Sequence, residues 1–124
     1  MAKHLVGAAL AALVAWGAAA QPPPAANCLH GPSETSAEAA RRRAALDLAR
    51  QVNTTEAQAH QQGHTYYVLS DLPGLKSEIN GFKVQLSTDG ASYTFSVKDT
   101  LDACRFAYFS DQEGVIYSAT PTRP

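Results

Sequence analysis

The chain contains 124 residues, of which ten are Lys or Arg and eleven are Asp or Glu, and its formal net charge is −1. A chain of this length suits one small domain with a modest core. The near-neutral charge excludes proteins that hold nucleic acid or an anionic membrane surface by charge alone. We therefore expect no nucleic-acid partner.

The first 20 residues have the order of a secretory signal peptide, with Lys3 and His4 before an apolar run and three alanines that end at Ala20. Even counted to residue 20, that run is shorter than the ~18 to 20 residues that cross a bilayer, so we expect no membrane span. We predict cleavage near Ala20 and a soluble protein in the periplasm or outside the cell. A lipid anchor at Cys28 is the alternative, although the residues before it lack a lipobox pattern.

The two cysteines, Cys28 and Cys104, are predicted to form a disulfide, because export places them where thiols oxidise. The bond would close a loop of about 75 residues and stabilise the fold by roughly 3 to 4 kcal/mol. The alternative is two unrelated thiols, one buried and one near a mobile terminus.

The segment before residue 35 is predicted to be an extended lead-in over residues 21–34, because it holds three consecutive prolines and a Gly-Pro pair. Thr35 and Glu38 then form a capping-box pattern, and no Gly or Pro follows until Gly63. We predict a long helix that ends at Gly63 as a left-handed C-cap. One face of this helix carries a narrow stripe of mostly small side chains, formed by Ala45, Leu48, Val52, Thr55 and Ala59. A broad apolar surface must cover this stripe.

Four short strands are predicted after the helix, at residues 81–86, 92–97, 105–109 and 115–119, from alternating apolar residues and intervening turn residues. An Asp-Gly pair at residues 89–90 favours a tight hairpin between the first two. Short links imply an antiparallel meander with one apolar face. With the long helix on that face, residues 35–124 are predicted to form a two-layer α+β domain.

The order of these segments resembles the globular domain of type IV pilins and type II secretion pseudopilins. The resemblance runs through VNTTEAQ at the helix end, LSDLPG, GFKVQL, SYTFSVKD and the closing FAYFSDQEGVIYSATP, and covers roughly residues 40–121. It implies a pilin-like headgroup with a structural or interaction role, whose partners are pilus or secretion components. Pilins begin with an unbroken apolar helix, whereas a signal peptide, prolines and the arginines at 41–43 stand here, which argues against ordinary incorporation into a filament core.

No pattern for catalysis or for a cofactor is present: the serines lack a GxSxG motif, and there is no glycine-rich phosphate loop. We therefore predict a protein that is not an enzyme. His60 and His64 have a spacing that could bind a metal on a helix, but Gly63 falls between them and the glutamate of an HExxH motif is absent. Solvated histidines are the favoured interpretation.

Four acidic residues near loops are candidates for a calcium site of the kind that the pseudopilin resemblance would allow: Asp99, Asp102, Asp111 and Glu113. They are expected near one end of the sheet, where oxygen ligands could meet. The segment SDQEG lacks the spacing of a calcium loop, so turn-forming, solvated acids are favoured and no metal site is predicted.

A candidate interaction loop follows the helix, since long ordered loops often carry recognition. Its residues are Tyr66, Tyr67, Leu69, Asp71 and Leu72. Arg41, Arg42 and Arg43 are interpreted as a solvated helix face, with a docking patch for an acidic partner as the alternative. The alternative function is a small secreted ligand-binding or enzymatic domain that reuses the fold, which a pocket lined by convergent polar groups would favour.

Overall fold

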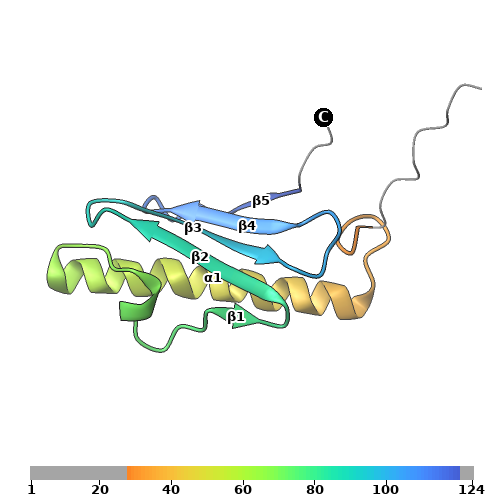
Figure 1. Cartoon of the computed structure of the whole chain (residues 1–124), viewed down its shortest axis with the longest axis horizontal. Coiled ribbons are helices and arrows are strands. Elements are labelled where there is room, and N and C mark those ends of the chain that lie inside the picture. Colours follow the sequence, from red (N-terminus) through yellow and green to blue (C-terminus); the bar gives the residue numbers. More distant parts are fainter. Residues whose placement is uncertain (1–27, 121–124) are drawn as a thin grey trace, which may run out of the picture.

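The computed structural model describes residues 28–120. The predicted signal peptide, its cleavage point near Ala20 and residues 21–27 of the lead-in lie outside the described residues. One long helix, α1 (Ser36–Gly63), lies across one face of a five-stranded antiparallel sheet (Figure 1). In the part of the chain that the structure describes, no helix is long and apolar enough to span a bilayer.

Helix α1 begins where the sequence predicts. The Oγ1 atom of Thr35 accepts a hydrogen bond from the Glu38 amide at 3.2 Å, which satisfies one of the free amides of the first turn. The Glu38 carboxylate binds the Nε of Arg41. The Thr35 cap therefore marks the start of the helix, and the Glu38 side chain pairs with Arg41 one turn later.

The helix ends one residue later than predicted. Gly63 is its last helical residue, and the left-handed position is His64, with φ of 57°. Gly63 is nevertheless needed for space, because a Cβ atom there would lie 2.3 Å from the Tyr67 hydroxyl. The prediction of Gly63 as the left-handed cap is therefore wrong, and the glycine allows the chain that follows to lie close to the helix.

The sheet contains one more strand than the four predicted. Its order follows the chain, with every neighbouring pair antiparallel: β1 (Glu78–Ile79), β2 (Phe82–Thr88), β3 (Tyr93–Asp99), β4 (Ala107–Asp111) and β5 (Tyr117–Ala119). The two-residue β1 is too short for an alternating pattern. Its signal is the pair Asn80 and Gly81, which both have positive φ and turn β1 tightly into β2.

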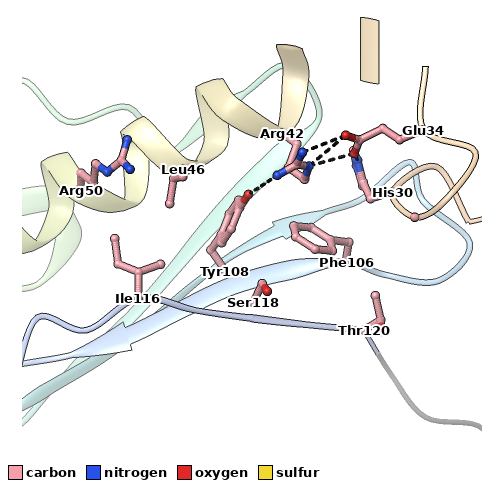
Figure 2. Close-up of a pocket in the computed structure, with 11 residues that line it drawn as sticks. His30, Glu34, Arg42, Leu46, Arg50, Phe106, Tyr108, Ile116, Ser118 and Thr120 are labelled. Atoms are coloured by element: carbon pink, nitrogen blue, oxygen red, sulfur yellow. Dashed lines mark hydrogen bonds and ion pairs between the residues drawn. The ribbon is translucent and has the colours of Figure 1, made fainter. Parts of the chain in front are cut away.

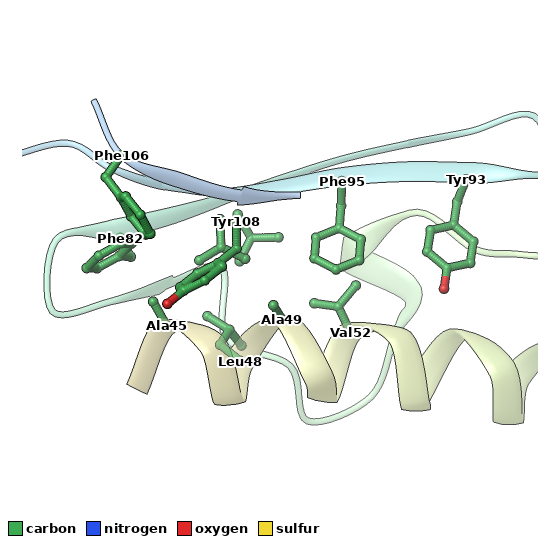
Figure 3. Packing of buried hydrophobic residues seen from close by; sticks show 11 residues of the cluster. Ala45, Leu48, Ala49, Val52, Phe82, Tyr93, Phe95, Phe106 and Tyr108 are labelled. Atoms are coloured by element: carbon green, nitrogen blue, oxygen red, sulfur yellow. The ribbon is translucent and has the colours of Figure 1, made fainter. Parts of the chain in front are cut away.

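The core lies between α1 and the sheet, and Figure 3 shows the side chains of the two layers meeting. The helix contributes small or medium residues: Ala45, Leu48, Ala49 and Val52. The sheet and its β3–β4 connection contribute mostly larger ones: Phe82, Val84, Tyr93, Phe95, Val97, Phe106 and Tyr108. Ala45, Leu48 and Val52 of the predicted stripe are buried, whereas Thr55 and Ala59 are half-buried. Because alanine side chains are short, the aromatic residues of the sheet can lie directly on the helix.

The predicted disulfide is confirmed: Cys28 is bonded to Cys104, with 5.2 Å between their Cα atoms. Nearby, the buried Asp102 carboxylate accepts hydrogen bonds from the amides of Leu29, Cys104 and Phe106. These contacts fasten the residues before α1 to the β3–β4 connection. The structure thus adds residues 28–34, which the sequence assigns to the lead-in, to the packed part of the chain.

Candidate functional site

Of the five residues predicted to form an interaction loop, only Asp71 is exposed. Leu72 is buried, and Leu69, in the short 3₁₀ helix η1 (Leu69–Asp71), packs against the core. Tyr66 and Tyr67 are half-buried. This segment therefore turns most of its apolar side chains toward the domain.

The Tyr66 ring shows why the segment packs inward. It stacks on His60, with 4.3 Å between ring centroids, and meets Tyr93 edge-on at 4.8 Å. His64 lies beyond the helix in the left-handed position and is exposed. Since one histidine is stacked on a tyrosine and the other has left the helix, the pair does not present a metal site on one helical face.

The four acidic residues considered for calcium lie at opposite ends of the sheet. Asp111 pairs with Thr94 at the start of β3, whereas Asp99 ends β3 and Asp102 follows it. The expectation that they share one end is therefore wrong. The antiparallel pairing of β3 with β4 separates them, because the two pairs of acids occupy opposite ends of these strands.

A buried polar cluster forms around His30, which is 5% exposed. Its Nδ1 lies 2.7 Å from Glu34 Oε2, and its Nε2 lies 2.7 Å from Asp99 Oδ2. An ionised carboxylate can only accept hydrogen bonds. Both ring nitrogens of His30 therefore face carboxylate oxygens, and the ring joins the pre-helix segment to β3.

Two arginines of α1 complete the cluster. Arg42 donates from Nε and Nη2 to Glu34 and from Nη1 to the Tyr108 hydroxyl at 3.3 Å. Hydrogen bonds from Arg42 lower the pKa of the Glu34 carboxyl to about 2, against the opposing effect of burial. Arg41 donates from Nη2 to Asp99 and from Nε to Glu38.

The Asp99 carboxyl stays ionised although it is fully buried. Burial acts to raise its pKa, but hydrogen bonds from Arg41, the Leu101 amide and His30 outweigh burial and lower that pKa.

Arg41 and Arg42 are thus partly buried ion-pair partners, and interpreting them as a solvated face is wrong. Only Arg43 of the three is exposed. No local sequence pattern singles out His30, because its partner Asp99 is 69 positions away.

The cluster also contains the atoms of a possible metal site. Ligand atoms of His30, Glu38 and Asp99 lie within 4.8 Å of one another. However, Arg41 Nη2 already contacts one oxygen of each of the two carboxylates, Glu38 Oε2 and Asp99 Oδ2. The guanidinium provides the positive charge that these carboxylates require, so the arrangement fits a structural ion-pair cluster rather than a metal centre.

A groove of about 640 Å³ opens beside this cluster, between the first half of α1 and the β4–β5 end of the sheet (Figure 2). One wall is the helix row Arg42, Leu46 and Arg50, which are spaced four residues apart. The other wall carries side chains spaced two apart, from Ile116 through Ser118 to Thr120, and Phe106 and Tyr108 lie between the two walls. The groove therefore combines two guanidinium groups, hydroxyl groups and an apolar floor.

A second buried acid lies in the other half of the helix. Glu56 is fully buried, and its Oε2 accepts a hydrogen bond from the Tyr67 amide at 3.0 Å. Its Oε1 has no hydrogen-bond partner among the described residues. Burial raises the pKa of the Glu56 carboxyl, and the Tyr67 amide and the charge of His60 only partly oppose the rise. This carboxyl holds the start of the segment after α1 against the helix.

Comparison with known protein families, with curated proteins and with solved structures found no match to this chain.

Proposed function

We propose that this chain is an exported, pilin-like interaction domain that binds another protein and catalyses no reaction. Its partners would be components of a type IV pilus or of a type II secretion system. The arrangement of one long helix over an antiparallel sheet supports this proposal, as does the disulfide that joins the pre-helix segment to the β3–β4 connection. The sequence of the C-terminal hairpin supports it too, because that hairpin carries much of the resemblance to pilins.

The observation that carries the proposal is an exposed aromatic pair on the sheet. Phe109 of β4 and Tyr117 of β5 are paired in the register, and their rings stack with centroids 5.4 Å apart. They are 42% and 55% exposed, and Val115 beside them in the chain is also exposed. Their neighbour Tyr108 points into the core beside α1, so Phe109 points to the opposite face. Exposed aromatic groups are typical of protein interfaces.

Cross-linking of the mature protein in envelope extracts, followed by mass spectrometry, tests this function. The double variant Phe109→Ser/Tyr117→Ser should lose its cross-links to pilus or secretion components while keeping its disulfide and its thermal stability. The matched control, Val68→Ser/Leu101→Ser, removes two exposed apolar side chains elsewhere and should keep the cross-links. Equal cross-linking by the two double variants would contradict this contact surface, and recovery of no such component would contradict the function.

A second candidate function is ligand binding in the groove beside α1. The observation that favours it is the convergence of Arg42, Arg50 and Ser118 around an apolar floor. Binding sites commonly combine a mostly apolar lining with a few placed polar groups. Among the described residues that line the groove, none is a serine or cysteine nucleophile bonded to His30, so the groove supports binding rather than catalysis.

A further inference from the structure

We propose that the groove between α1 and β5 binds an extended peptide segment with an acidic side chain, which joins the sheet beside β5 as an additional strand. This inference goes beyond the protein contact proposed for the aromatic pair, because the groove lies on the other face of β5. The two surfaces are therefore tested by different variants.

The first argument is the shape of the groove. Its helix wall runs from Arg42 to Arg50, about 12 Å at 1.5 Å per residue, and its strand wall runs from Ile116 to Thr120, about 13 Å at 3.3 Å per residue. In Figure 2 the two walls run side by side, with Arg50 near Ile116 and Arg42 nearer Thr120. A trough with walls of equal length fits about four residues of extended chain.

The second argument is the open edge of the sheet. β5 pairs with β4 on one side and is the last strand of the sheet in the described residues, so its other side has backbone groups with no strand partner there. The strand Tyr117–Ala119 is short, which is one common protection of an exposed edge, but it contains no charged residue and no proline, which are two others. A peptide that pairs with this edge would direct alternate side chains to the face where α1 lies, and thus into the groove.

The third argument is charge. Arg50 has a 62% exposed side chain, and its only described hydrogen bond runs from Nη1 to Asp47. Four of its five N–H groups are therefore available to a ligand, and guanidinium binds carboxylate in a paired geometry. Arg42 is already paired with Glu34, the only carboxylate among the described lining residues, so Arg50 is the guanidinium of this wall that can take a further carboxylate. An acidic side chain on the peptide is thus the complement of this wall.

The test is nuclear magnetic resonance titration of the mature, oxidised protein. The probe is a pool of capped six-residue peptides that alternate valine and threonine and carry one glutamate at each position in turn, at roughly 1 mM. We expect shifts of the amides at residues 116–120 and of the Arg50 side chain. No shift at any groove residue with this pool would overturn the proposal.

Two matched comparisons identify the binding mode. Arg50→Gln should weaken binding of the best peptide roughly tenfold, whereas Arg43→Gln, at an exposed arginine outside the groove, should leave it unchanged. Methylation of alternate peptide nitrogens should abolish binding, because it blocks pairing with the strand edge. Equal binding by the two arginine variants, equal binding of the methylated peptide, or complete competition by free acetate at equal concentration would each overturn the proposal.

Discussion

The guanidinium of Arg42 meets the carboxylate of Glu34 edge to edge, with Nε 2.8 Å from Oε2 and Nη2 2.8 Å from Oε1. The pair joins α1 to the segment before it, and His30 extends the connection to Asp99 on β3. The pre-helix segment, the start of α1 and the distant strand β3 are therefore held by one set of charges. The stability of this end of the domain depends on those charges remaining in place.

The first prediction concerns acid. Interaction with Arg42 lowers the pKa of Glu34 from 4.5 to about 2, so the pair stabilises the folded state fully above pH 4.5. That contribution should be lost as the pH falls from about 4.5 to about 2, because the unfolded state takes up the proton first. Glu34→Gln should lower the free energy of unfolding by about 1 to 2 kcal/mol at pH 7, and by much less near pH 2.

Urea denaturation of the oxidised protein at several pH values measures this effect. The control is Asp47→Asn, which removes the acid of an exposed i,i+3 pair with Arg50 on the same helix. Exposed pairs contribute little, so this variant should change the free energy of unfolding by less than about 0.5 kcal/mol at any pH. An effect of Glu34→Gln that does not vary between pH 7 and pH 2 would contradict the ion-pair explanation.

The second prediction concerns Glu56, whose ionised carboxylate should lower the free energy of unfolding rather than raise it. Burial raises the pKa of Glu56, so the ionised form destabilises the fold above the folded-state pKa, and this cost disappears as the pH falls below the unfolded value. Glu56→Gln keeps an acceptor for the Tyr67 amide and removes the charge. It should therefore raise the free energy of unfolding at pH 7, by about 1 kcal/mol. Thermal denaturation at pH 7 and pH 4 measures the difference, with the exposed Glu113→Gln as a neutral control.

The sequence predicts those parts of the fold that depend on residues close together in the chain. Local patterns act over a few residues, so the Thr35 cap, the helix and the alternating strands were predictable. The disulfide was predictable because the sequence has only two cysteines, which offer one pairing, and its first 20 residues have the pattern of a signal peptide. The strand β1 was missed because two residues carry no periodicity, although Asn80-Gly81 is a hairpin signal.

The candidate site was largely hidden from the sequence for a physical reason. Prolines and glycine in residues 21–34 predict an extended lead-in, yet His30 is buried between Glu34 of the same segment and Asp99 of β3. Similarly, a run of arginines is usually solvated, and only the fold shows that Arg41 and Arg42 meet acids. The groove depends on where β5 ends relative to α1, which no local pattern specifies.

The third prediction concerns the close approach of Tyr67 to the helix end. Alanine at Gly63 improves helix propensity by about 1 kcal/mol, but its Cβ would lie 2.3 Å from the Tyr67 hydroxyl. Gly63→Ala alone should therefore give little or no stabilisation. In a Tyr67→Phe background the same change should stabilise, because the clashing oxygen is gone and the ring Cζ, 3.3 Å from the new Cβ, needs to move by only a few tenths of an ångström. A double-mutant cycle measured by urea denaturation should give a coupling of about 1 kcal/mol, and strict additivity would contradict the close approach.

The fourth prediction concerns the disulfide and the ion pair together. Cys28→Ala/Cys104→Ala should lower the free energy of unfolding by roughly 3 to 4 kcal/mol, since the bond closes a long loop. Neither cysteine belongs to the hydrophobic core, so the far-ultraviolet circular dichroism of α1 and the sheet should be retained. The bond also fastens the segment that carries His30 and Glu34 to the β3–β4 connection. The ion pair with Arg42 should therefore weaken when the bond is absent.

A second double-mutant cycle tests that dependence. Glu34→Gln should cost about 1 to 2 kcal/mol in the oxidised protein, and clearly less in the cysteine-free double variant. The reason is that an unfastened segment loses conformational entropy each time it docks, which reduces the net contribution of its contacts. Asp47→Asn, whose pair with Arg50 lies within α1, should have the same small effect in both backgrounds. An equal cost of Glu34→Gln with and without the disulfide would show that His30 and Glu34 dock independently of Cys28.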